Sequence, residues 1–197
     1  MSLAKKFTAP KGTILFSPGQ DCPGFVILKR GCIKVTLTGS SGREVVLYRV
    51  HPGEVCLQTF TCLIKDQTYS AEGVVEEDLQ GDLIPAGQFR QVMEQDESFR
   101  NTVLTSVALR FSEYQQLIED VALTGFDARL AKVLLRLADV QGMVQVTHTA
   151  LAAETASGRA YVSRRLAEFA RRGLVEQLPD GVHICNAPEL AQISDQK

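Results

Sequence analysis

Hydrophobic residues in the first part of the chain occur in short runs, and glycine, proline or aspartate separates each run from the next. Short runs rich in Val, Ile, Leu, Phe and Thr predict β-strands, and the separating residues predict turns. Many short strands at this spacing favour a small antiparallel β-roll or jelly roll. The predicted strands are residues 13–16, 25–29, 32–38, 44–50, 55–57, 69–75 and 79–84.

After Pro85 the apolar residues recur every three or four positions, which predicts helices at residues 86–95 and 98–123. In the longer helix the spacings alternate between three and four, as at the a and d positions of a coiled coil. Such a seam packs either on the chain's own barrel or on the same helix of a second copy. We favour a dimerisation helix with supporting barrel contacts, because this helix joins two domains. The seam residues are Leu104, Val107, Phe111, Tyr114, Ile118 and Val121.

The C-terminal pattern indicates two short helices that follow another helix and a short strand. Thr147 can cap the first short helix, and Gly173 supplies the left-handed residue that ends the second. A Pro-Asp-Gly turn then joins two further strands in a hairpin. This order is typical of a winged helix-turn-helix. The predicted elements are helix 127–140, strand 144–146, helices 149–154 and 159–172, and strands 174–177 and 182–185.

Charge adds a functional indication to the second of these short helices. The chain has a formal net charge of -2 and a pI near 5.9, which excludes a uniformly basic nucleic-acid coat. Its second short helix nevertheless carries five arginines and only one acid, Glu168. A basic helix held by a preceding helix is the form that enters the DNA major groove, although a solvated amphipathic surface is the alternative. The arginines are Arg159, Arg164, Arg165, Arg171 and Arg172.

These patterns predict an α+β fold with three parts. Residues 1–97 form an antiparallel β-roll or jelly-roll domain, 98–124 the dimerisation helix, and 125–197 a winged helix-turn-helix DNA-binding domain. Thr124-Gly125 is the expected hinge. No apolar run can span a bilayer and no signal peptide precedes the roll, so we expect no membrane partner. Five cysteines in no extracellular pattern favour a reducing cytoplasm.

With these residues in place, the chain resembles the Crp/Fnr superfamily of bacterial transcription regulators over nearly its whole length. The cyclic-nucleotide-binding-domain pattern of this superfamily is matched by Gly31 and Pro52-Gly53-Glu54. The helix-turn-helix pattern of the superfamily is matched by Val162-Ser163-Arg164 and Gly173-Leu174-Val175. The resemblance implies a homodimer that binds a palindromic operator in double-stranded DNA. It also implies a roll that senses a small-molecule or redox signal, and contact with RNA polymerase if the protein is an activator.

The same resemblance assigns DNA-contacting positions. Arg159, Ser163 and Arg164 take the base- and phosphate-contacting places, where arginine can bind guanine in bidentate fashion. Ala160 stands where many relatives have a glutamate, so the usual half-site does not apply. Tyr161 is placed to reach a phosphate or a thymine methyl. Thr147 and His148 begin the first short helix, whose N–H groups can meet a phosphate; for His148 a solvated surface role is the alternative.

The sensor positions depart from the cyclic-nucleotide pattern. Glu54 matches the ribose-binding acid of such relatives, but Tyr69-Ser70 stands where an arginine would bind the cyclic phosphate. Tyrosine cannot supply that cation, so we predict that cyclic AMP is not the effector. Cys56 and Cys62 lie in this segment and are either a thiol switch or two buried hydrophobic residues.

Cofactors and other functions remain open at this point. Cys22 and Cys32 do not form the N-terminal cluster that iron–sulfur relatives need, and no residue identifies a haem ligand, so the cofactor is unknown. One alternative function is a small-molecule-binding barrel whose helix-turn-helix contacts protein. A cupin-like enzyme is the other, but three histidines, two of them in the C-terminal part, provide little for a metal centre.

Overall fold

The structure is a computed structural model that describes residues 4–40, 42–123 and 125–195, with the side chains of α3 described as far as Ile118. Two compact units are described separately below. The first comprises Met1–Leu37 with Leu47–Tyr114, and the second comprises Thr38–Val46 with Gln115–Lys197. Among the described residues, no helix is both long enough and apolar enough to cross a membrane.

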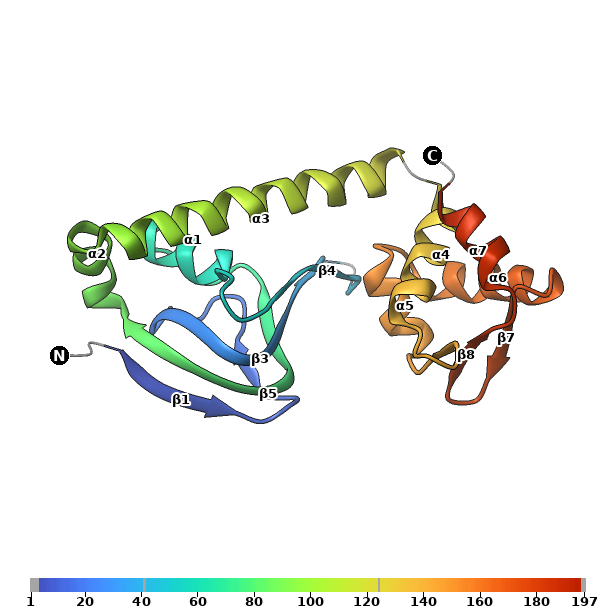
Figure 1. The fold of residues 1–197 in the computed structure, drawn as a ribbon, viewed down its shortest axis with the longest axis horizontal. Helices are drawn as coiled ribbons and strands as arrows, with labels where there is room; N and C mark the ends of the chain where they lie inside the picture. Colours follow the sequence, from blue (N-terminus) through green and yellow to red (C-terminus); the bar gives the residue numbers. More distant parts are fainter. Residues whose placement is uncertain (1–3, 41, 124, 196–197) are drawn as a thin grey trace. The chain divides into compact units, whose positions relative to one another are not determined.

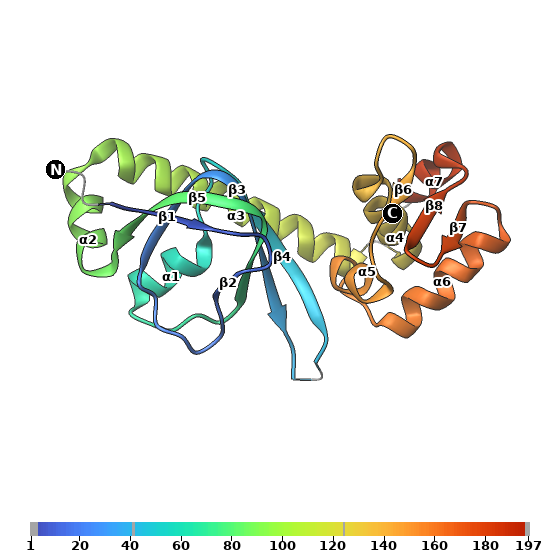
Figure 2. The ribbon, with the colours of Figure 1, turned by 90° about the horizontal axis from the view of Figure 1, so that it is seen from below.

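The first unit is an antiparallel β-roll, as predicted. Its strands follow the order β1-β5-β3-β4, and β2 also pairs with β5. Figure 2 shows β1 running along β5 at one edge of the roll. The strands are β1 (Lys5–Ala9), β2 (Ile14–Phe16), β3 (Gly24–Thr38), β4 (Glu44–Val50) and β5 (Glu72–Pro85).

Strand boundaries were predicted less well than the roll itself. The predicted strands 25–29 and 32–38 form one strand, β3, because Gly31 takes a φ of +91° inside a bulge instead of ending the strand. A Cβ at Gly31 would lie 2.5 Å from the Asp78 carbonyl, so only glycine fits there. Strands 69–75 and 79–84 likewise form the single strand β5, and strand β1 was not predicted.

Three helices complete this unit. The predicted strand 55–57 is wrong, because Val55 makes only an isolated bridge with Ile27 and the chain then enters α1 (Leu57–Lys65). Helix α2 (Ala86–Gln95) has the predicted bounds, and its Phe89 stacks on Phe25 with ring centroids 4.8 Å apart. Helix α3 (Glu97–Leu123) is capped by Asp96, whose Oδ1 accepts a hydrogen bond of 2.9 Å from the Phe99 N–H.

The second unit is a winged helix-turn-helix around one apolar core. Figure 1 shows helices α4 to α7 beside the hairpin of β7 and β8, and β6 pairs with β8 to complete a small sheet. The core residues include Leu130, Leu134, Leu151, Leu166, Phe169 and Leu190. The elements are α4 (Phe126–Leu137), β6 (Met143–Val144), α5 (His148–Glu154), α6 (Arg159–Arg171), β7 (Val175–Leu178), β8 (Gly181–Ile184) and α7 (Ala187–Ser194).

Helix α7 was not predicted, although its start carries a readable signal. The Asn186 side chain caps it by accepting a 3.2 Å hydrogen bond from the Glu189 N–H, and Pro188 occupies the first turn. Its Leu190 is fully buried in the core. Packing against α4 therefore stabilises a helix that is too short to be stable alone.

Gly173 has a φ of +71°, and a Cβ there would meet no atom within 4 Å. We expect Gly173→Ala to lower the free energy of unfolding by about 1 kcal/mol, because an alanine is strained in the left-handed conformation. Gly87→Ala is the matched control: it also adds a Cβ in open space, but inside α2, where it should stabilise by up to about 1 kcal/mol. Urea unfolding of both variants measures the signs, and equal effects would contradict the argument.

Candidate DNA-binding surface and sensor site

The joint of the helix-turn-helix is built from local hydrogen bonds. Thr147 caps α5 as predicted, since its Oγ1 accepts a 3.1 Å hydrogen bond from the Ala150 N–H. Thr155 ends α5 and donates its buried hydroxyl to the Leu151 carbonyl at 2.7 Å. Ala156 then takes a φ of +50°, a left-handed turn residue that reverses the chain into Gly158 and α6.

His148 and Ser163 contact each other. The His148 Nδ1 and the Ser163 Oγ lie 2.8 Å apart, which links the start of α5 to the outer side of α6. Both side chains are half-buried, so His148 is not the fully solvated residue considered as an alternative. This contact fixes the Ser163 rotamer and leaves the hydroxyl further hydrogen-bonding capacity on its exposed side.

Three of the five arginines of this segment are held in ion pairs. Arg165 binds Asp127 of α4 through two hydrogen bonds, of which Nε–Oδ1 measures 2.6 Å. Arg171 pairs with Glu168, and Arg172 pairs with Glu189 of α7 at 3.1 Å. The acids on α4 and α7 therefore reduce the positive charge that the helix sequence alone suggested. The tertiary partners could not be read from the helix because they lie far away in sequence.

Arg159 and Arg164 have no acidic partner within the described part of the chain, and both are exposed on the N-terminal half of α6. Tyr161 is 42% exposed and packs on Phe126 with ring centroids 4.6 Å apart. The Arg164 guanidinium lies 5.6 Å from the centre of the Tyr161 ring, which orients it by a cation–π contact. With exposed Ala160 between them, these residues form a surface that can bind phosphates and base edges.

Glu54 is occupied by a contact within the first unit. Its Oε2 accepts a 2.7 Å hydrogen bond from Arg110 of α3 and a 2.8 Å bond from the His51 N–H. Partial burial acts to raise the pKa of the Glu54 carboxyl, but the hydrogen bonds from His51 and Arg110 outweigh it and hold that pKa below its usual value. Glu54, to which the resemblance gave a ribose-binding role, thus binds α3 instead.

Arg110 was missed in the sequence, although its spacing offered a signal. It lies three residues after Val107 and four before Tyr114, and so faces the roll with them. Only 5% of the side chain is exposed, and its guanidinium lies 4.8 Å from the centre of the Tyr48 ring. Burial acts to lower the pKa of Arg110, but the contacts with Glu54 and Glu113 raise it overall, so the residue stays charged.

Ser70 is bound by a residue that sequence reasoning also missed. The Gln58 Oε1 accepts hydrogen bonds from the Ser70 Oγ at 3.1 Å and the Ser70 N–H at 3.3 Å. Gln58, rather than Glu54, therefore joins α1 to the segment before β5. Tyr69 points inward and stacks on Phe16 with centroids 4.4 Å apart. Burial raises the pKa of the Tyr69 phenol, so the side chain at this position is uncharged.

The cysteines of the sensor segment are buried thiols. Cys56 and Cys62 are both buried, and burial raises the pKa of Cys56 and raises that of Cys62 to about 11. Cys22 lies in the same cluster, because its Sγ accepts a 3.1 Å hydrogen bond from the Tyr69 hydroxyl. The nucleophilic form of cysteine is the thiolate, so both members of the predicted pair are held in their unreactive form.

The heptad seam of α3 divides between two faces. Val107 and Tyr114 pack on the cores of the first unit, and Tyr114 meets Tyr48 edge-on at 5.7 Å. Leu104, Phe111 and Ile118 are instead 52%, 61% and 66% exposed. The side chain of Val121 and the hinge residue Thr124 lie outside the described residues. One half of the seam thus contacts the chain's own roll, and the other half forms an exposed apolar stripe.

One group of potential metal ligands occurs among the described residues. Glu176, His183 and Cys185 lie on the β7–β8 hairpin with their ligand atoms within 4.8 Å of one another. Structural zinc sites are almost always closed by four ligands, and this exposed group is one ligand short. It provides no positive identification of a metal centre.

Comparisons with known proteins agree with this geometry. Residues 6–96 match the family model of the cyclic nucleotide-binding domain, and residues 128–193 match that of the Crp-like helix-turn-helix domain. A search of curated proteins found no match.

Solved structures extend the similarity to nearly the whole chain. A transcriptional regulator of the Crp/Fnr family from Eubacterium rectale is 26% identical with a TM-score of 0.87, covering 97% of this chain and 89% of its own. The c-di-GMP responsive global regulator CLP of Xanthomonas campestris is 17% identical with a TM-score of 0.81, covering 93% and 94%. A CRP/FNR-family regulator from Thermus thermophilus is 18% identical with a TM-score of 0.79, covering 98% and 99%.

The buried thiols lead to a prediction about reactivity. At pH 7.5 iodoacetamide should alkylate exposed Cys185 first, and Cys56 and Cys62 should react only when the protein unfolds, because both are inaccessible thiols with raised pKa values. Mass spectrometry of timed samples measures the order, and Cys185→Ser removes the fast site as a control. Labelling of Cys56 or Cys62 at the rate of Cys185 would show that the pair is accessible and reactive.

Proposed function

Because the chain belongs to the Crp/Fnr family of transcription regulators, we propose that it is a homodimeric, sequence-specific DNA-binding regulator of the bacterial cytoplasm whose β-roll senses a signal. The family consists of regulators rather than enzymes. The observation that carries the proposal is the surface on α6, where Arg159 and Arg164 are exposed without an acidic partner among the described residues. DNA phosphates and guanine edges supply the acceptors that such arginines need.

Anchoring of α6 supports a role in base reading. Arg165 ties the helix to α4 through Asp127, and the His148–Ser163 contact ties it to α5. These contacts hold α6 rigidly on both sides, so that Arg159 and Arg164 can be presented in a defined geometry. A fixed helix loses little conformational entropy on binding, and its side chains can therefore discriminate between bases.

The exposed stripe of α3 supports a dimer. Leu104, Phe111 and Ile118 follow one another at heptad spacing, and apolar side chains that line up in a contiguous exposed stripe mark an interaction surface. A second copy of the same helix presents the identical stripe and can pack in parallel about a two-fold axis. The two recognition helices would then read the two halves of a palindromic operator.

A signal in the roll has a direct structural route to α3. Tyr48 lies against Cys56 at the start of α1, with the Tyr48 hydroxyl 4.0 Å from the Cys56 Sγ. The same ring contacts Arg110 and Tyr114 of α3. A change near α1 would therefore shift the helix that carries the dimer stripe. Because Tyr69 provides no cation for a phosphate, we propose that the effector is not cyclic AMP.

A thiol or reactive-sulfur input at Cys56 and Cys62 is the alternative to a small-molecule effector. Cys22 supports it, because its thiol contacts the Tyr69 hydroxyl and adds a third cysteine to this part of the roll, while the raised pKa values of Cys56 and Cys62 disfavour it. The alkylation experiment above decides between the two, because a thiol sensor must react in the folded state.

DNA recognition is tested with an operator selected from a random-sequence pool. Arg159→Ala should weaken binding by ~1–3 kcal/mol and relax base preference at one position of each half-site. Arg171→Ala is the control: it also removes one exposed positive charge from α6, but one paired with Glu168 near the other end of the helix. It should leave the base preference unchanged. Operator affinity and base preference are measured by fluorescence anisotropy at several salt concentrations. If both are unchanged in Arg159→Ala, this surface of α6 does not contact the bases.

Dimerisation is tested on the exposed stripe. Phe111→Glu places a charge in the proposed interface and should convert the dimer to monomers with loss of operator binding. Leu109→Glu is the matched control, because Leu109 is 63% exposed but lies two residues away, about 200° around the helix. Light scattering coupled to gel filtration gives the masses. A dimer that withstands Phe111→Glu would place the interface elsewhere.

A further inference from the structure

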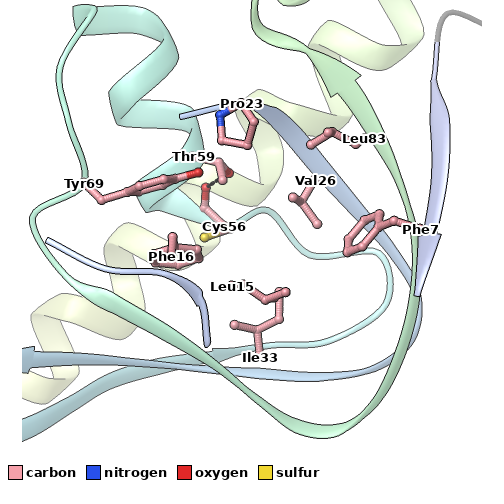
Figure 3. A pocket seen from close by; sticks show the side chains of 10 residues that line it. All are labelled: Phe7, Leu15, Phe16, Pro23, Val26, Ile33, Cys56, Thr59, Tyr69 and Leu83. Carbon is pink, nitrogen blue, oxygen red and sulfur yellow. Dashed lines mark hydrogen bonds between the residues drawn. The ribbon is translucent and has the colours of Figure 1, made fainter. Parts of the chain in front are cut away.

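The β-roll holds an apolar cavity of about 220 Å³ that is partly open to solvent (Figure 3). Strands β1, β2, β3 and β5 contribute side chains to its wall, and Cys56 and Thr59 close it at the start of α1. Half of the lining residues are buried, with Phe16, Ile33 and Tyr69 each less than 5% exposed, and Pro23 is exposed. The lining residues are Phe7, Leu15, Phe16, Pro23, Val26, Ile33, Cys56, Thr59, Tyr69 and Leu83.

No charged side chain occurs in this lining within the part of the chain that the structure describes. Bringing a phosphate or carboxylate into such a space without a cation would cost several kcal/mol. Arg110 cannot serve, since it is not part of the wall and is committed to Glu54 and Glu113. The uncharged lining of the cavity therefore disfavours cyclic nucleotides and other anions.

The few polar atoms of the wall lie together on the side of α1. Figure 3 shows the oxygens of Thr59 and Tyr69 near the Cys56 sulfur, with Phe7 and Leu83 at the opposite end. Both hydroxyls already donate: Thr59 to the Cys56 carbonyl at 2.8 Å and Tyr69 to the Cys22 Sγ at 3.1 Å. Each oxygen retains lone pairs, so this end of the cavity can accept a hydrogen bond from a ligand.

We propose that the cavity binds a small, uncharged molecule with an apolar body and one hydrogen-bond donor, such as an alkylphenol, and that this molecule is the effector of the regulator. An apolar protein cavity of about 150 Å³ stays dry and binds benzene, so the larger space here fits a substituted single ring. The donor group of the ligand faces Thr59 and Tyr69, and its apolar body faces Phe7, Leu15 and Leu83. The effector role rests on the proposed DNA-binding function; the binding itself does not.

Only a few side-chain contacts separate a ligand in the cavity from helix α3. A ligand against Cys56 presses on the residue that precedes α1, and the Cys56 Sγ lies 4.0 Å from the Tyr48 hydroxyl. That hydroxyl also accepts a 3.2 Å hydrogen bond from the Gln58 N–H. Tyr48 in turn contacts Arg110 and Tyr114 on α3. The ligand thus acts on the contacts that position the dimerisation helix.

Binding is tested on the full chain with toluene and p-cresol as probes, using isothermal calorimetry and thermal unfolding. Both probes should bind and raise the unfolding temperature. Leu15→Phe fills the cavity and should weaken both by ~10-fold or more. Ile14→Phe is the matched control, since neighbouring Ile14 is 58% exposed on the other face of β2 and the variant should bind normally. If Leu15→Phe fails to fold, Val26→Leu adds one carbon to the wall and should weaken both probes to a smaller extent.

The polar end is tested with Tyr69→Phe. In the wild type p-cresol should bind about 2- to 10-fold more tightly than toluene, the value of one net hydrogen bond. This preference should shrink in Tyr69→Phe while toluene affinity stays within error. Absence of binding by either probe, or equal binding by Leu15→Phe and the wild type, would overturn the proposed site.

The effector role has a separate readout. At a concentration near its wild-type dissociation constant, p-cresol should change the affinity for the selected operator in the wild type and in Ile14→Phe, and much less in Leu15→Phe. Probe binding with no change in operator affinity would overturn the effector role and leave the binding site standing. Loss of operator binding under all conditions would instead refute the proposed DNA-binding function, because the calorimetric result does not depend on DNA.

Discussion

The first unit depends on the contacts of the buried Arg110 guanidinium. A cation that is only 5% exposed is stable there because Glu54, Glu113 and the face of Tyr48 surround it. Removing both acids would leave a buried charge uncompensated, which is strongly destabilising. The arrangement therefore fixes α3 on the roll, and it turns the remaining apolar side chains of that helix outward.

This contact changes the meaning of the residues around it. Glu54 matched a ligand-binding acid in the sequence, yet it holds α3 while Gln58 contacts Ser70. With Arg110 committed to these acids and Tyr69 uncharged, the roll holds an apolar cavity. The family fold is retained around a cavity that has no charged side chain in its described lining.

In the second unit, too, some arginines form ion pairs while others remain exposed. Arg165, Arg171 and Arg172 are neutralised by acids, two of which come from other helices. What remains exposed is a short surface around Arg159, Ala160 and Arg164, oriented by the ring of Tyr161. A surface so limited suits discrimination between sequences better than general attraction to DNA, because affinity without many phosphate contacts must come from bases.

The sequence by itself determined the α+β class, the roll, the bounds of α2 and the helix-turn-helix, because periodicity, caps and turn residues act locally. It also placed Arg159 and Arg164 on one exposed helix. The tertiary structure decided the rest. Gly31 was read as a turn but forms a bulge because β5 approaches it closely. Helix α1 was not predicted, although Leu57, Phe60 and Ile64 recur at helical spacing, because the wrongly expected strand 55–57 ended where the helix begins. The pairing of Arg110 with Glu54 and of Arg165 with Asp127, and the cavity between the strands, depend on residues far apart in sequence. Such contacts form only when the chain packs, so no local sequence pattern can predict them.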